Sequence, residues 1–123
     1  MFSLFKARAP ESKNSLFFVV IKIARGTNLE IPENFSGALV PAFAAAPTHE
    51  LALKAAVVKL QAQGFEFLDV QGSVLQLDPQ QWSSYVRGTW PEFEQYLPGQ
   101  REVIAGVSAG SVFFGPFASY AGA

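Results

Sequence analysis

Residues 16–24, LFFVVIKIA, form an apolar run that contains one charged residue, Lys22. The run combines aromatic and β-branched residues, which favour the extended backbone of a β-strand, and it ends at the turn-prone RGTN of residues 25–28. We therefore expect it to form the first strand of the protein and the centre of its sheet.

A second strand is predicted at residues 38–45, ALVPAFAA, after a loop at residues 31–37. Pro41 interrupts the apolar run of this strand. Because proline has no backbone N–H to donate to a neighbouring strand, it is confined in sheets to edge strands and bulges. We therefore expect the second strand to lie at an edge of the sheet or to contain a bulge.

The clearest helix is predicted between Thr48, whose hydroxyl can cap the first free N–H groups, and Gly64, which can end the helix in a left-handed conformation. The runs FEFLDV at residues 65–70 and VLQLD at residues 74–78 follow as two strands. The glycine-bearing QGS between them favours a tight turn, so we expect these two strands to form a hairpin.

A second helix is predicted to begin at Asp78, with Pro79 in its first turn, and to end near Gly88. Residues 91–97, PEFEQYL, are expected to add a short helical turn. The chain then closes with two predicted strands joined by SAG, and these are EVIAGV at residues 102–107 and SVFFGPF at residues 111–117.

The expected order of elements is therefore β-β-α-β-β-α-β-β. Its middle six elements have the β-α-β-β-α-β order of ferredoxin-like proteins, in which two helices cover one face of an antiparallel sheet. The fold class predicted from the sequence is thus α+β. The length of 123 residues indicates a single domain spanning residues 1–123, with residues 1–14 loosely ordered.

Composition narrows the range of partners and compartments. A formal net charge of -1 leaves no basic field for a phosphate backbone, which argues against nucleic-acid binding. The chain contains no cysteine, which excludes disulfides and thiolate metal sites and fits the cytoplasm. The apolar run at residues 16–24 is too short to cross a bilayer and contains Lys22, so no membrane association is expected.

Residues 106–110, GVSAG, match the G-x-S-x-G pattern of a nucleophile elbow, in which a serine sits on a turn between strand and helix. Ser108 would then need a base. In hydrolases of this kind the acid and the histidine follow the serine, whereas His49 precedes it and Glu102 is the last acidic residue. We therefore interpret GVSAG as a chance match in the final hairpin and expect a protein that is not an enzyme.

No cofactor is expected. A zinc site needs three or four nitrogen, sulfur or oxygen ligands, and the chain has one histidine, His49, and no cysteine. Neither a phosphate-binding loop nor a dinucleotide-binding glycine motif occurs.

The segment WSSYVRGTWPEFEQYLP, at residues 82–98, concentrates large aromatic side chains among charged ones. Tryptophan, tyrosine and arginine anchor many protein interfaces, but aromatic rings also fill cores. One helix face cannot bury five rings, so we expect Trp90 or Tyr96 to be partly exposed. The residues of this segment that are interface candidates are Trp82, Tyr85, Arg87, Trp90, Glu92, Phe93, Glu94 and Tyr96.

The blocks DPQQWSSYVRGTWPEFEQYLPG, at residues 78–99, and VFFGPF, at residues 112–117, resemble in general character the small cytosolic immunity proteins of bacterial toxin-immunity pairs. This resemblance covers about the C-terminal third of the chain. It implies a compact α/β domain that binds and blocks a toxin domain. The residues expected to meet a basic toxin surface would then be Glu66, Asp69, Glu92 and Glu94, together with Trp90 and Tyr96.

Two alternatives remain open on the sequence alone. One is a ferredoxin-like small-ligand-binding protein or enzyme that forms a homodimer, which the apolar half of the composition permits. The other is a structural subunit of a larger assembly, joined through exposed strand edges.

Overall fold

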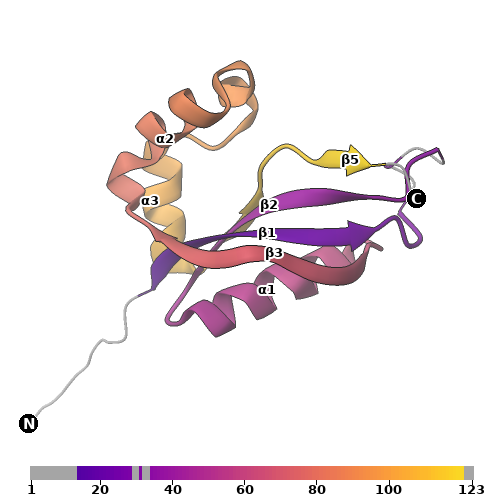
Figure 1. The fold of residues 1–123 in the computed structure, drawn as a ribbon. Helices are drawn as coiled ribbons and strands as arrows, with labels where there is room; N and C mark the ends of the chain where they lie inside the picture. The colour runs from indigo at the N-terminus through magenta and orange to yellow at the C-terminus, as the bar shows by residue number, and fades with distance from the viewer. Residues whose placement is uncertain (1–13, 29–30, 32–33, 121–123) are drawn as a thin grey trace, which may run out of the picture.

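The computed structural model describes residues 14–28, 31 and 34–120. Most of the segment expected to be loosely ordered, residues 1–14, therefore lies outside the described residues. The protein is an α+β protein with a five-stranded antiparallel sheet (Figure 1). Its elements in chain order are β1 (Ser15–Ala24), β2 (Gly37–Ala46), α1 (His49–Ala62), β3 (Glu66–Leu77), η2 (Pro79–Gln81), α2 (Trp82–Thr89), η3 (Pro91–Tyr96), α3 (Gln100–Ala109), β4 (Val112–Phe114) and β5 (Ala118–Tyr120).

The central position predicted for residues 16–24 is confirmed. β1 pairs along its length with β2 on one side and with β3 on the other. The far side of β2 pairs first with β5, at residues 37–39, and then with β4, at residues 42–44. β3 therefore forms one edge of the sheet, and β4 and β5 share the other edge.

The edge position or bulge expected for the strand containing Pro41 is wrong, because β2 lies inside the sheet and its register with β1 runs through Pro41 without a shift. The carbonyl of Pro41 accepts a hydrogen bond from the N–H of Gly115 at 2.8 Å, on the side facing β4 and β5. The N and C=O of a strand residue point to the same side, so the missing N–H faces the interruption between those two short strands. Proline is tolerated in an interior strand here because its partner edge is broken at that position.

The helix predicted between Thr48 and Gly64 is confirmed as α1. The Thr48 hydroxyl accepts a hydrogen bond from the N–H of Leu51 at 3.2 Å, and Gly64 has a φ of +94°. The start predicted at Asp78 is confirmed as well, since its carboxylate accepts from the N–H of Gln80 at 2.9 Å. This segment opens as the 3-10 turn η2 and continues as α2.

The predicted hairpin at residues 65–78 is wrong, because β3 is one continuous strand paired with β1. Gly72 does adopt a positive φ, +79°, but it lies at a register shift rather than at a chain reversal. The pairing passes from Phe18 opposite Leu75 to Val20 opposite Gln71, so extra residues of β3 bulge out between them.

The strand predicted at residues 102–107 is also wrong, because this segment belongs to helix α3. The Glu102 carboxylate accepts a hydrogen bond from the N–H of Gly99 at 2.8 Å at the start of the helix. Val103 is buried and Val107 is half-buried one turn later, in the same hydrophobic cluster. Gly110 ends the helix with a φ of +73°, so the SAG segment is a helix end and not a hairpin turn.

The helices also cover different faces of the sheet, contrary to the expected single helical face (Figure 1). Val19 and Ile21 of β1 point to α1, where they pack with Ala56 and Leu60. Residues of β1 and β2 with the opposite alternation pack against α2 and α3 at one end of the sheet, and these include Leu16, Phe18 and Phe43. The observed order is β-β-α-β-α-α-β-β among the regular strands and α-helices, so the expected ferredoxin-like order is not found in the described elements.

Candidate functional site

An aromatic cluster joins the sheet to α2 and to Trp90, the residue between α2 and η3. At its centre is Phe43 of β2, which is fully buried and has ring contacts with five aromatic side chains. Trp82 packs on Phe43 with ring centroids 5.0 Å apart, and its indole N–H donates to the carbonyl of Pro98 at 2.7 Å. This hydrogen bond holds the turn before α3 against the start of α2.

The aromatic segment at residues 82–98 therefore belongs partly to the core. Trp82 is buried, and Tyr85 and Trp90 are half-buried in the same cluster. Burial raises the pKa of the Tyr85 hydroxyl above its usual value of 10.0, although a hydrogen bond with Thr89 works in the opposite direction. These three rings support the interpretation that aromatic residues here pack the domain.

Two rings of the same segment face solvent, as expected from the number of aromatic residues. Phe93 is 38% exposed and Tyr96 is 75% exposed, and both belong to η3. In a 3-10 helix, side chains three positions apart lie above one another, so these two rings share one side of η3. The prediction that Trp90 or Tyr96 is partly exposed is confirmed by Tyr96.

The exposed side of η3 lines a groove of about 400 Å³. Its walls are contributed by η3 and by the segment between β4 and β5. A methyl group on Gly115 would lie 3.2 Å from the Trp90 ring and 3.3 Å from Pro41, so this glycine lets the wall approach the aromatic cluster. The lining residues are Phe93, Tyr96, Leu97, Phe114, Gly115, Pro116 and Phe117.

Sequence reasoning missed the second wall of this groove. Residues 111–117 were expected to form one strand, whereas β4 ends at Phe114 and a separate strand, β5, begins at Ala118. Phe117 lies between them, is 36% exposed and contacts the Phe65 ring at a centroid distance of 5.6 Å. Local sequence carried one usable signal, since Gly115 and Pro116 both disfavour a continuous strand.

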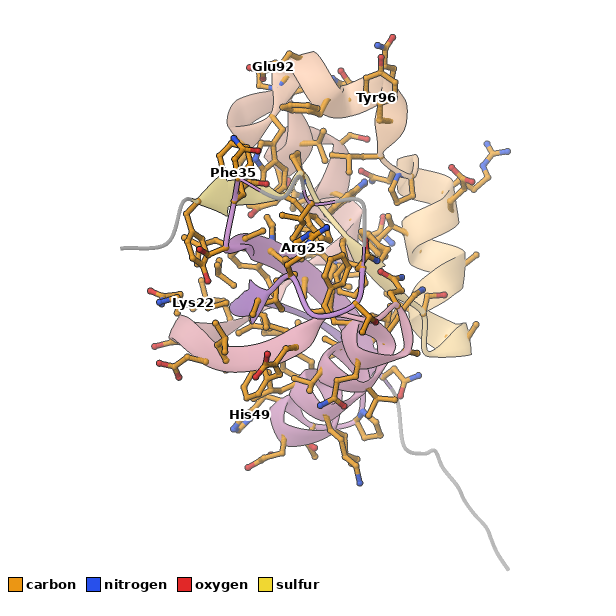
Figure 2. All side chains as sticks on the ribbon, turned by 90° about the vertical axis from the view of Figure 1, so that its right-hand side faces the viewer. Lys22, Arg25, Phe35, His49, Glu92 and Tyr96 are labelled. Carbon is orange, nitrogen blue, oxygen red and sulfur yellow. The ribbon has the colours of Figure 1, made fainter. Side chains whose placement is uncertain are left out.

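Acidic side chains lie beside the groove. Glu92 and Glu94 of η3, together with Pro91 and Gln95, line a second hollow of about 410 Å³. Glu94 forms an ion pair with Arg87 at 3.3 Å, and both side chains are solvent-exposed. In Figure 2, Glu92 and Tyr96 project from the same end of the molecule, opposite the end that carries His49.

The structure does not bring Glu66 and Asp69 to this surface. Both residues lie on β3, opposite Ala24 and Lys22 of β1. β3 is one edge of the sheet, and the groove lies beyond the other edge, beside β4. The four carboxylates grouped from the sequence therefore form two separate pairs.

Ser108 lies in the last turn of α3 and is exposed. A nucleophile elbow passes from strand to helix, whereas the chain here passes from helix α3 to strand β4. His49 starts α1, where its imidazole lies 3.4 Å from the Glu50 carboxylate. Within residues 14–28, 31 and 34–120, no three histidine, aspartate or glutamate side chains gather closely enough to hold a metal ion.

No protein-family model matches the chain, and comparisons with curated proteins and with solved structures find no match. Among the described elements, no helix has the length and apolar composition needed to cross a membrane.

Proposed function

We propose that this protein is a non-enzymatic module that binds another protein through the groove beside η3. The observation that carries the proposal is the exposure of Phe93 and Tyr96 on one side of a 3-10 helix that contributes no buried residue. Aromatic side chains supply large contact area with little loss of conformational entropy, and tyrosine adds a polar end that tolerates solvent before binding.

The charges around the groove favour a basic partner. Glu92 makes no ion pair among the described residues, and the Arg87–Glu94 pair is solvent-exposed and so contributes little stability of its own. The η3 surface therefore keeps a net negative character beside its exposed rings. A partner with an apolar side chain next to lysine or arginine would be steered to this surface and held there.

This profile agrees with the expectation of an immunity protein, which would bind and neutralise a toxin domain in the cytoplasm. The position of Ser108 at the end of a helix supports treating GVSAG as a chance match. In the proposed complex the contact residues are Glu92, Phe93, Glu94 and Tyr96, with Arg87 at the rim, whereas Trp82, Tyr85 and Trp90 belong to the core cluster.

The test begins with tagged protein captured from a lysate of the source organism and identification of the proteins that copurify. The affinity of a copurifying protein is then measured for wild type, for Tyr96→Ala and for the matched control Leu75→Ala, which truncates a 52% exposed side chain on β3. We expect Tyr96→Ala to weaken binding by about tenfold or more, as for an interface anchor, with Leu75→Ala unchanged.

Charge reversal tests the two pairs of carboxylates separately. Glu92→Lys should slow association with a basic partner, and Glu66→Lys should not, because Glu66 lies at the other sheet edge. Equal effects of Tyr96→Ala and Leu75→Ala, or a loss confined to Glu66→Lys, would remove the η3 groove from the proposal.

A second candidate function, a subunit of a homo-oligomer or larger assembly, is favoured by the β3 edge. Among the described strands, β3 pairs on one side only, and its exposed large apolar side chains are Phe67, Leu68 and Leu75. A free strand edge of this kind can add another strand. Size measurement at micromolar concentration distinguishes the two, since a homodimer broken by Leu68→Asp supports the edge and a monomer supports the groove.

A further inference from the structure

We infer that the occupant of the η3 groove is an extended, proline-containing segment of the partner that carries a lysine or arginine next to the prolines. This inference rests on the proposed binding function and adds the chemistry of the ligand.

The length of the groove limits what can lie in it. The wall of the groove on this side runs from Phe93 to Leu97, so it spans about 10 Å at the 3-10 rise of roughly 2 Å per residue. A polyproline II segment rises about 3.1 Å per residue, so about three of its residues would follow this wall. Prolines or other compact apolar residues would then contact Phe93, Tyr96 and Phe117, which are the exposed rings of the groove.

The small contact area favours a ligand that is already ordered. Stable interfaces between folded proteins bury about 800 Å² per partner, more than a groove of this length offers. A segment that had to fold on binding would lose ordering entropy that such a short contact cannot offset. A polyproline II segment is largely preformed, and aromatic-lined grooves are the surfaces that recognise it.

The groove is itself held in place, which also lowers the entropy lost on binding. The Gly115 N–H is fixed to the Pro41 carbonyl at 2.8 Å. The Phe117 ring is packed between Phe65 and Phe114, with centroid distances of 5.6 Å and 6.3 Å. One wall is therefore anchored to the central sheet.

The acidic hollow selects a basic residue in the ligand and fixes the direction in which the segment binds. Glu92 and Glu94 line a separate hollow on η3, and neither of them lines the groove of Phe93 and Tyr96. A lysine or arginine that follows the prolines would extend past η3 toward these carboxylates while the prolines contact the rings. An acidic residue at the same place would be repelled.

The experiment uses a blocked six-residue peptide of five prolines followed by one arginine, titrated into the full-length protein by isothermal calorimetry and by amide chemical shifts. One control peptide has glycine in place of every proline, and another has glutamate in place of the arginine. We expect saturable binding of the proline-arginine peptide, with both control peptides about tenfold weaker or undetectable.

Single substitutions test whether the proline-arginine peptide binds in the groove. Tyr96→Ala should weaken binding of the proline-arginine peptide by about tenfold, and Glu92→Gln should remove the preference for arginine over glutamate. Leu75→Ala should bind like wild type. Equal affinity for the proline and glycine peptides, or absence of saturation at millimolar concentration, would overturn the inference.

The two proposals fail in different ways. If the captured partner needs Tyr96 but the proline-arginine peptide does not bind, the extended-segment inference is wrong and the binding function stands. If the peptide binds and Tyr96→Ala leaves its affinity unchanged, the peptide binds outside the groove and the extended-segment inference is wrong, whereas the binding function fails only if the captured partner also binds Tyr96→Ala like wild type.

Discussion

The two faces of the sheet are covered in different ways. Under α1, aliphatic side chains such as Ile21, Ile23 and Val40 are fully buried, and the helix seals them with small and branched residues. At the α2 end, aromatic side chains build the core around Phe43, and two further rings of the same segment, Phe93 and Tyr96, are exposed on η3. One region is therefore an aliphatic core covered by a helix, and the other is an aromatic core followed along the chain by exposed rings.

This difference bears on function because a closed aliphatic core mainly stabilises the fold. Exposed rings such as Phe93 and Tyr96 can also contact a partner. Substitution of a core ring should therefore change the free energy of unfolding far more than substitution of an exposed ring.

Phe43→Ala should lower the unfolding free energy by about 3–5 kcal/mol, because it removes the fully buried ring at the centre of the aromatic cluster. Urea unfolding of the purified variant measures the change. Tyr96→Ala is the comparison variant. Its unfolding free energy should stay within about 0.5 kcal/mol of wild type, because Tyr96 is exposed. Similar losses for both variants would mean that Tyr96 belongs to the core.

Gly72→Ala tests the bulge in β3, which lies between the pair Phe18–Leu75 and the pair Val20–Gln71. An added methyl group meets no atom within 4 Å, so the cost comes from the positive φ alone and should be about 1–2 kcal/mol. Gly88→Ala is the matched control, since it also meets no atom within 4 Å but lies in helix α2. It should stabilise by about 0.5–1 kcal/mol, and thermal unfolding resolves the opposite signs.

Asp78→Ala removes the cap that starts the helical part of the aromatic end. The carboxylate accepts the Gln80 N–H at 2.9 Å, so its loss should cost about 1 kcal/mol. Asp78→Asn keeps an accepting oxygen and should restore most of the stability in urea unfolding. An Asn variant no better than the Ala variant would show that the cap is not the reason for the loss.

The smallest effect concerns Tyr85, a half-buried ring of the aromatic cluster. Burial raises its pKa above 10.0 in the folded state, so the folded protein holds the hydroxyl proton more tightly than the unfolded chain. Its contribution to stability is therefore complete below about pH 10 and is lost as the pH rises through the folded-state pKa. Tyr85→Phe should flatten this part of a stability-against-pH profile, and an unchanged slope would contradict the burial of the hydroxyl.

Several features could be predicted from the sequence because their causes are local. The apolar run of β1 identifies the central strand, and Thr48 and Gly64 mark the ends of α1 through capping and positive φ. The excess of rings in residues 82–98 over one helix face indicated an exposed aromatic residue, and Tyr96 is exposed.

Other features depend on contacts distant in sequence. Gly72 adopts the positive φ of a turn glycine, and the pairing of β3 with β1 on both sides of it makes a bulge instead. The β-branched residues of α3 favour a strand locally, yet the four-residue spacing of Val103 and Val107 packs them on the aromatic cluster. The wall at Gly115 forms through its hydrogen bond to Pro41, more than seventy positions earlier.

The most direct test of the central claim is the affinity of the captured partner protein for wild type and for the Phe93→Ala, Tyr96→Ala double variant, with urea unfolding measured on the same samples. We predict a loss of binding of about a hundredfold with little change in stability, because the two rings lie outside the core. Retained affinity in a folded double variant, or capture of no protein that depends on these rings, would contradict the assignment of the η3 groove as the binding surface.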